Sequence, residues 1–227
     1  MLDARLPIAL IVTLLPIQAE AQRITVDGRL SPAQTLTGPN YAIGAELGKQ
    51  VGGNLFHSFG NFGLTKGETA TFNGPATVTN IVGRVTGGRA SSIDGTVRST
   101  VAGANFYLIN PSGIVFGPNA AIDVKGSFRA STAEYLRMSD GARFQVTAPD
   151  GSALSAAPPV AFGFLNATPG RITVNGSTLT AARIGGLGRL GRVLSLFLAL
   201  FRVFALFFAL IRRLVWSSHG FSPLFRL

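Results

Sequence analysis

Hydrophobic residues between positions 105 and 132 fall into short runs that turns interrupt at nearly even spacing. Three of these runs, at 106–109, 114–116 and 121–124, are each followed by turn-forming residues such as Asn, Pro, Ser and Gly. Two prolines and three glycines fall within the 16 residues from 111 to 126, which a helix cannot accommodate. The pattern therefore predicts strands of three to five residues that turn back on one another.

Similar short strands are expected along the body of the chain, which we place between residues 22 and 180. Most of them lie between Gly, Pro, Asn or Asp residues, which is typical of strands joined by tight turns. Ser131 and Glu134 fit a capping box, so a helix of about two turns, a strand and a corner are all open for the residues that follow. The other expected strands are 24–26, 55–59, 69–72, 77–82, 92–97, 127–130, 144–147 and 171–174.

Most of these strands are too short for a β-sandwich or a barrel, in which inward and outward positions alternate over more residues. Apolar positions recur after 21 or 22 residues, from Ile93 to Ile114 and from Phe106 to Phe128. A parallel β-helix with three strands per coil fits this spacing, with about seven coils of roughly 22 residues. The sequence therefore predicts an all-β parallel β-helix. Residues 22–51 have few clear strands, and we expect them to cap its N-terminal edge.

The first 21 residues are expected to be an export signal. They contain Arg5, a 12-residue apolar stretch from 6 to 17, and the motif Ala-Glu-Ala at 19–21. This apolar stretch is too short to cross a bilayer, and the three parts follow the order of a secretory signal peptide. We expect cleavage between Ala21 and Gln22.

The composition changes abruptly after residue 180. Residues 181–227 contain seven arginines and no lysine or acid, among many Leu and Phe residues. The 19 residues from Val193 to Ile211 have only Ser195 and Arg202 as polar residues. As a helix they would span about 28 Å, close to the apolar thickness of a bilayer. Two interpretations stay open for this apolar, helical tail. It is either an inner-membrane anchor, or a shifted reading frame that makes the protein a truncated one.

Charge and residue types argue against nucleic-acid binding and against most enzyme classes. The formal net charge is +10, but the tail carries +7 of it and has no polar face for a phosphate backbone. The chain has no cysteine and only two histidines, His57 and His219, so no metal site is expected. Residues 186–191 match a dinucleotide-binding glycine pattern, but no acid follows Asp150. We expect no catalytic residue, no cofactor and a structural role for His57.

Six motifs follow one another along the body of the chain. They are GNLFHSF at 53–59, NIVGRVTGG at 80–88, SIDG at 92–95, FYLINPSGIVFGP at 106–118, SFRAST at 127–132 and ITVNGS at 172–177. Together they resemble the N-terminal secretion domain of filamentous-haemagglutinin-type exoproteins, also called the haemagglutination activity domain, from two-partner secretion in Gram-negative bacteria. The most specific piece, NPSGI at 110–114, resembles the family's NPNGI motif with Ser112 in place of the second Asn.

The resemblance implies a right-handed parallel β-helix and a protein that is not an enzyme. It implies export through the periplasm to the medium or the cell surface, with an outer-membrane transporter whose POTRA domains read residues 22–180. In such adhesin-like proteins a host or neighbouring-cell surface is a further expected partner. The candidates for transporter recognition or for coil corners are Asn54, Asn110, Pro111, Gly113 and Ile114. The alternative function is that of an inner-membrane-anchored periplasmic binding or scaffold protein.

Overall fold

The computed structural model describes residues 24–166, 168–177 and 183–184. These residues form short β-strands and two single 3₁₀ turns, η1 (Ala45–Leu47) and η2 (Pro149–Gly151). The expected cleavage site at Ala21 and Gln22 lies outside the described residues, as does the segment from Val193 through Arg202 to Ile211. None of the described residues belongs to a helix long and apolar enough to cross a membrane.

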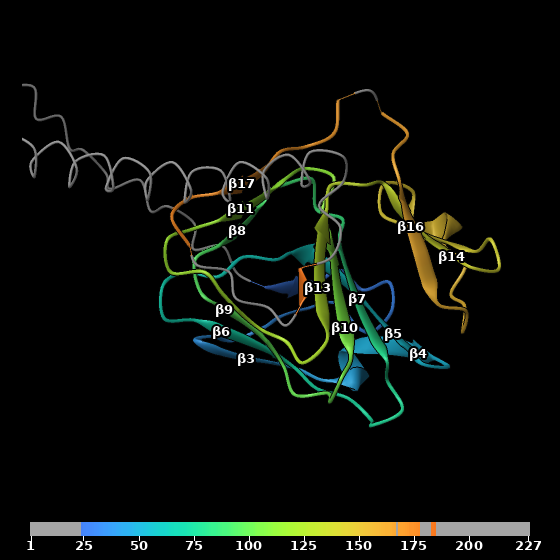
Figure 1. Ribbon diagram of the computed structural model, residues 1–227, viewed down its shortest axis with the longest axis horizontal. Helices are drawn as coiled ribbons and strands as arrows, with labels where there is room; N and C mark the ends of the chain where they lie inside the picture. The colour runs from blue at the N-terminus through green and yellow to red at the C-terminus, as the bar shows by residue number, and fades with distance from the viewer. Residues whose placement is uncertain (1–23, 167, 178–182, 185–227) are drawn as a thin grey trace, which may run out of the picture.

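Parallel strands are stacked in three sheets, which form the sides of a β-solenoid of about four turns (Figure 1). The parallel strands of sheet A are β5 (Asn54–Asn61), β7 (Asn80–Val85), β10 (Asn105–Ile109), β13 (Ser127–Ser131) and β18 (Arg183–Ile184). Sheet B consists of β3 (Asn40–Ile43), β6 (Thr69–Phe72), β9 (Thr96–Ser99) and β12 (Ala121–Asp123). Sheet C consists of β8 (Ser91–Ile93), β11 (Ile114–Phe116) and β17 (Ile172–Val174). The all-β parallel coil expected from the sequence is therefore confirmed.

The two turns that begin with β7 and β10 visit sheets A, C and B in that order. The expected single strand at 92–97 is in fact two strands, β8 and β9, because the chain turns a corner at Asp94 and Gly95. Gly95 packs so closely on the carbonyl oxygen of Glu68 that a β-carbon there would overlap it. Glycine is therefore required at this corner, and the sharp turn divides the strand.

The expected number of seven coils was too high for two reasons. Partners in sheet A are 26 residues apart between β5 and β7, 25 between β7 and β10, and 22 between β10 and β13. The first turns are thus longer than the 22 residues read from the apolar spacing. In addition, residues 132–163 leave the stack, so the turn that runs from β13 through β17 to β18 is much longer, with Ser127 opposite Arg183.

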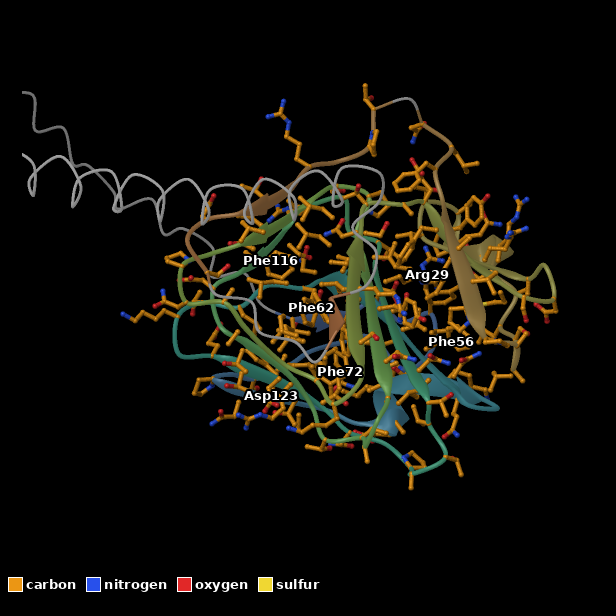
Figure 2. The ribbon with its side chains drawn as sticks, viewed as in Figure 1. Arg29, Phe56, Phe62, Phe72, Phe116 and Asp123 are labelled. Carbon is orange, nitrogen blue, oxygen red and sulfur yellow. The ribbon has the colours of Figure 1, made fainter. Side chains whose placement is uncertain are left out.

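The interior of the solenoid is filled by one apolar cluster that draws on all three sheets. Aromatic rings follow one another along it: Phe72 meets Phe106 edge to face with ring centroids 4.6 Å apart, and Phe106 stacks on Phe128 with centroids 5.8 Å apart. Figure 2 shows Phe62 and Phe72 between the sheets. Alternate residues of each strand point inward, because successive side chains of a strand lie on opposite faces.

Residues 132–163, which we call the strap, cover the outer face of sheet A. The strap contains the antiparallel sheet D, made of β14 (Tyr135–Met138), β15 (Arg143–Gln145) and β16 (Pro159–Gly163). The segment after the capping-box residues is therefore a strand. A second apolar cluster lies between the strap and sheet A. Because both faces of sheet A are covered, all six residues of β7 are buried.

The N-terminal edge of sheet A is covered by β1 (Thr25–Val26) and β4 (Gly48–Val51), which both pair antiparallel with β5, while β2 (Gln34–Thr35) pairs with β1. The expected cap at 22–51 also contributes a strand to the solenoid itself. Its strand β3 pairs parallel with β6 and so begins sheet B. At the opposite end, the outermost described strands are β12, β17 and β18.

Candidate functional site

Three asparagines at the starts of β5, β7 and β10 form a ladder on the outer face of sheet A. The Asn80 side-chain amide donates to the Asn54 side-chain oxygen at 2.9 Å, and the Asn105 amide donates to Asn80 at 3.1 Å. The ladder continues at one end, where the backbone N–H of Ser127 donates to Asn105 at 3.1 Å. At the other end, Asn54 donates to the carbonyl oxygens of Ser155 and Ala157 in the strap, at 2.8 and 2.7 Å.

The ladder sets the register of the first turns. Asn54 is opposite Asn80, and Asn80 is opposite Asn105, in the strand pairing itself. A slip by one residue would turn these amides into the apolar interior and turn core residues outward. Only Asn54 was a candidate from the sequence. Asn80 and Asn105 also begin strands at a matching spacing, and this was the signal that could have identified them.

Asn110 follows the last residue of β10 and lies at the corner between sheets A and C. Its side chain is fully buried. The amide donates to the Arg89 carbonyl oxygen at 2.9 Å and to the Ser91 hydroxyl at 3.0 Å. Its oxygen accepts from the backbone N–H of Ser112 at 3.0 Å, which closes an Asx turn. In the folded domain the hydrogen bonds of the Asn110 side chain therefore stabilise this corner.

The next candidates complete the same corner. Pro111 is partly buried, and Ile114 begins β11 with no exposed surface. Gly113 has φ of +118°, which only glycine adopts readily, and a β-carbon there would lie 3.1 Å from the Arg171 carbonyl oxygen. Asn54 lies at the opposite end of the strands of sheet A. It is in the same register row as Asn105, which begins β10, whereas Asn110 follows the last residue of β10. The structure therefore groups residues 110–114 and separates Asn54 from them.

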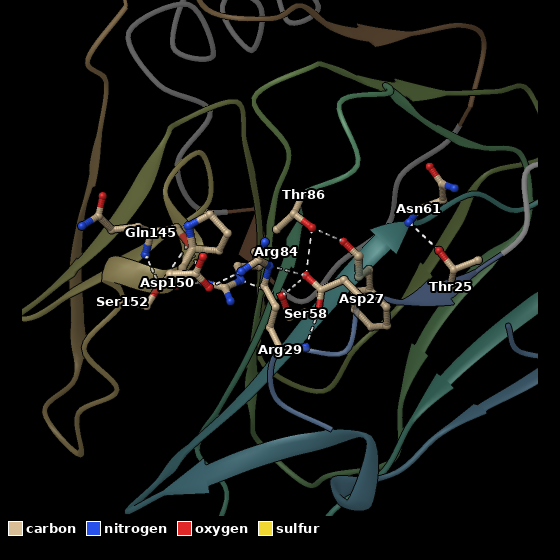
Figure 3. Close-up of polar contacts among 12 residues, drawn as sticks. Thr25, Asp27, Arg29, Ser58, Asn61, Arg84, Thr86, Gln145, Asp150 and Ser152 are labelled. Carbon is tan, nitrogen blue, oxygen red and sulfur yellow. Dashed lines mark hydrogen bonds and ion pairs between the residues drawn. The ribbon is translucent and has the colours of Figure 1, made fainter. Parts of the chain in front are cut away.

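A buried arginine clasp joins the cap, two turns of the solenoid and the strap (Figure 3). Arg84 on β7 has 1% of its surface exposed. Its guanidinium donates to the Ser58 hydroxyl at 2.7 Å. It also donates to two groups of the strap, the Gln145 carbonyl oxygen at 2.5 Å and the Ser152 hydroxyl at 2.6 Å. It also lies 4.4 Å from the ring centre of Phe144, a cation–π distance.

The negative charge that balances Arg84 is the carboxylate of Asp27, in the cap. Asp27 is linked to Arg84 through hydroxyl groups. The hydroxyls of Ser58 and Thr86 donate to Asp27 at 2.6 and 2.8 Å. Arg29 pairs with Asp27 at 3.7 Å and also with the exposed Asp150 of the strap. Burial lowers the pKa of Arg84 to about 10, against the opposing charge of Asp27, so the guanidinium stays charged at neutral pH. Arg84 and Asp27 carry no local signal in the sequence, because their partners are far away in the chain.

His57 points into the apolar interior of the solenoid. Its ring is fully buried and lies 5.9 and 5.5 Å from the rings of Phe59 and Phe72. Nδ1 lies 3.3 Å from the Leu47 carbonyl oxygen, which can only accept, while Nε2 has no partner. Burial lowers the pKa of His57 to about 4, so the ring is neutral at pH 7. The adjacent Ser58 faces the opposite side, toward Asp27.

The described side chains of the ladder, the corner and the clasp form structural hydrogen bonds. Among the described residues, no group of three or more His, Cys, Asp or Glu side chains is placed to hold a metal ion. The buried polar groups of the ladder, the corner and the clasp bond mainly to protein atoms. They define a parallel β-solenoid domain whose polar chemistry serves to register and lock its turns.

The family follows from comparison with known proteins. A family model described as the TPS secretion domain matches residues 22–191, which is most of the chain, and the protein belongs to this family. The chain therefore has a secretion-targeting role of the kind found in two-partner exoproteins, which are exported and interact with an outer-membrane transporter. Searches of the curated proteins and of the solved structures found no significant match.

Proposed function

We propose that residues 22–180 are the address by which a POTRA-barrel transporter of the outer membrane recognises this protein. The observation that carries the proposal is the family match over residues 22–191 on a chain that folds as a parallel β-solenoid. The signal at 1–21, with cleavage between Ala21 and Gln22, would deliver the chain to the periplasm. The product is then an adhesin-like protein in the medium or on the cell surface, where a host or neighbouring cell is its partner.

The burial of the candidate residues argues that recognition precedes folding. Asn54 and Asn110 have 1% and 0% of their surface exposed, and both donate all their amide hydrogens within the domain. A transporter could therefore contact these side chains only in the unfolded chain. Extended, uncharged segments such as NFYLI can pair with the edge of a POTRA sheet by strand addition. Folding outside the cell would then withdraw the same segments from the transporter.

Co-expression with the neighbouring transporter gene tests the proposed route. The expected result is that the protein reaches the medium only when the transporter is present. A pull-down with the transporter's POTRA domains adds the mechanism, using residues 22–180 both in urea and after folding. Binding is expected to the unfolded form alone, and equal binding by the folded form would refute recognition before folding.

The Asn110→Ala variant separates the two roles that we assign to this residue. If Asn110 is read by the transporter, the unfolded variant binds the POTRA domains more weakly than the wild-type chain does. Equal binding would leave Asn110 with its corner role only. Asn73→Ala is the matched control, because Asn73 is exposed and its side chain is in none of the described hydrogen bonds.

An inner-membrane-anchored periplasmic scaffold is the alternative proposal, and the apolar composition from Val193 to Ile211 favours it. Arg202 would lie within the membrane segment at a cost of about 3 kcal/mol, which the surrounding Leu and Phe residues offset. Cell fractionation distinguishes the two, since an anchored protein stays with the inner membrane. Translation of the encoding DNA in the other frames beyond residue 180 tests the shifted-frame interpretation. A strand-and-turn pattern in another frame would support that interpretation.

A further inference from the structure

The strap and sheet A meet through an apolar interface that is separate from the interior of the solenoid. Phe56, Val82, Tyr107 and Ile109 supply the sheet side, and all are buried. The strap contributes Leu136, Met138, Phe144 and Val146, among others. The rings of Phe56 and Phe144 have centroids 4.9 Å apart. The strap could leave this face without disturbing the inward-pointing core, because the two clusters lie on opposite sides of sheet A.

Two buried side chains of sheet A hold the strap by hydrogen bonds. Arg84 donates to Gln145, Pro149 and Ser152, and Asn54 donates to the carbonyl oxygens of Ser155 and Ala157. The separations along the chain are 61 to 68 residues for Arg84 and 101 and 103 residues for Asn54. If the strap lifts, both side chains lose these partners together.

The start of the strap is tied to the residues that directly follow its end. Glu134 has 2% of its surface exposed, and its carboxylate accepts the backbone N–H of Leu165 at 2.9 Å and the side-chain amide of Asn166 at 2.8 Å. Within the strap, β14 pairs with both β15 and β16. The segment therefore has its own sheet and its own closure, which are the features of a unit that moves as one body.

We propose that the strap opens and closes over sheet A as a single unit, independently of the solenoid, and that Arg84 is its latch. Closure of the strap strips water from the Arg84 guanidinium, and this desolvation cost opposes closure. The hydrogen bonds from the guanidinium to the strap favour closure. Opening uncovers an apolar face on β5, β7 and β10. β5, β7 and β10 precede the strap in the sequence. If the chain emerges with its N-terminus first, this apolar face therefore forms before the strap can cover it. Closure of the strap then buries the face, so that other proteins cannot bind to it.

Single cysteines provide a direct test, because the full chain contains none. Val82→Cys places a thiol under the strap, and Val85→Cys places one in the interior of the solenoid on the same strand. Both positions are at most 2% exposed. We expect a thiol reagent under native conditions to label Val82→Cys at least tenfold faster than Val85→Cys, with a smaller dependence on urea. Equal rates and equal urea dependence would mean that the strap opens only with the whole domain, and would overturn the proposal.

The latch is tested in the same assay. Arg84→Leu removes the bonds to the strap, and it also removes the bond to Ser58 and the charge that balances Asp27. Labelling at position 82 should therefore accelerate at least tenfold more than labelling at position 85. Arg98→Leu is the control, since Arg98 pairs with Asp123 on sheet B and makes none of the described hydrogen bonds to the strap. Ser152→Ala weakens the latch from the strap side and should produce a smaller acceleration. Unchanged labelling at position 82 in both latch variants, or equal acceleration at both positions, would remove Arg84 from this role.

Discussion

The side-chain amide of Asn80 donates a hydrogen bond of 2.9 Å to the side-chain oxygen of Asn54, one full turn of the solenoid earlier in the chain. Both residues are buried, with 7% and 1% of their surface exposed, and they are opposite one another in the strand register. Successive turns are thus joined by their side chains as well as by the backbone. A polar ladder of this kind stabilises one register against all others.

Asn80→Ala should lower the free energy of unfolding by about 1–3 kcal/mol, because it leaves the buried Asn54 oxygen and the Asn105 amide without their partner. The measurement is urea unfolding followed by circular dichroism. Asn73→Ala changes an exposed asparagine whose side chain is in none of the described bonds, and should shift the midpoint little. Similar losses in both variants would show that the ladder adds no stability of its own.

The stability of the domain should fall as the pH drops from about 6.5 to about 4, because of His57. The pKa of His57 is lowered to about 4 in the folded domain, so over this range the unfolded chain binds a proton that the folded chain does not. The contribution of neutral His57 to the free energy of unfolding is complete above pH 6.5, and about 3 kcal/mol of it is lost once the pH is below 4. Urea unfolding at several pH values measures it.

His57→Leu separates this effect from the titration of carboxylates. The variant keeps an apolar side chain in the interior and has no proton to bind, so its stability should change less between pH 6.5 and 4. A wild-type slope that persists in His57→Leu would assign the acid sensitivity to other groups.

Gly113→Ala should destabilise the corner after Asn110 by about 1–3 kcal/mol. The substitution forces a β-carbon into a φ of +118°, where it would also lie 3.1 Å from the Arg171 carbonyl oxygen. Gly103→Ala is the control, because Gly103 has φ of +67° but a β-carbon there would meet nothing within 4 Å. The first variant should therefore lose more thermal stability than the second, and an equal loss would show that crowding by Arg171 is unimportant.

Glu134→Gln should loosen the base of the strap. Leu165 and Asn166 donate to different oxygens of the carboxylate, so the NH₂ group of Gln would face one of these two donors and leave it without its acceptor, at a cost of about 1–3 kcal/mol. Hydrogen exchange should become faster for the amides of β14 and β16 than for those of β10. Glu46→Gln, at an exposed position of the cap, should leave exchange in the strap unchanged.

Local sequence determined the strands and turns of this protein. Glycine, proline and asparagine interrupt the apolar runs, and alternation within each run decides which side chains can face a core; the strands at 106–109, 114–116 and 127–130 were readable for this reason. The candidates at 110–114 were found from the resemblance of the NPSGI motif to the family's motif, in which the turn residues of the corner lie within a few positions. Only the tertiary structure decided the length of each turn, the departure of the strap from the stack, and the meeting of Arg84 with Ser152 and of Asn54 with Ala157. These contacts join residues 68 and 103 positions apart, and they depend on which sheet faces the chain packs against, which no local pattern specifies.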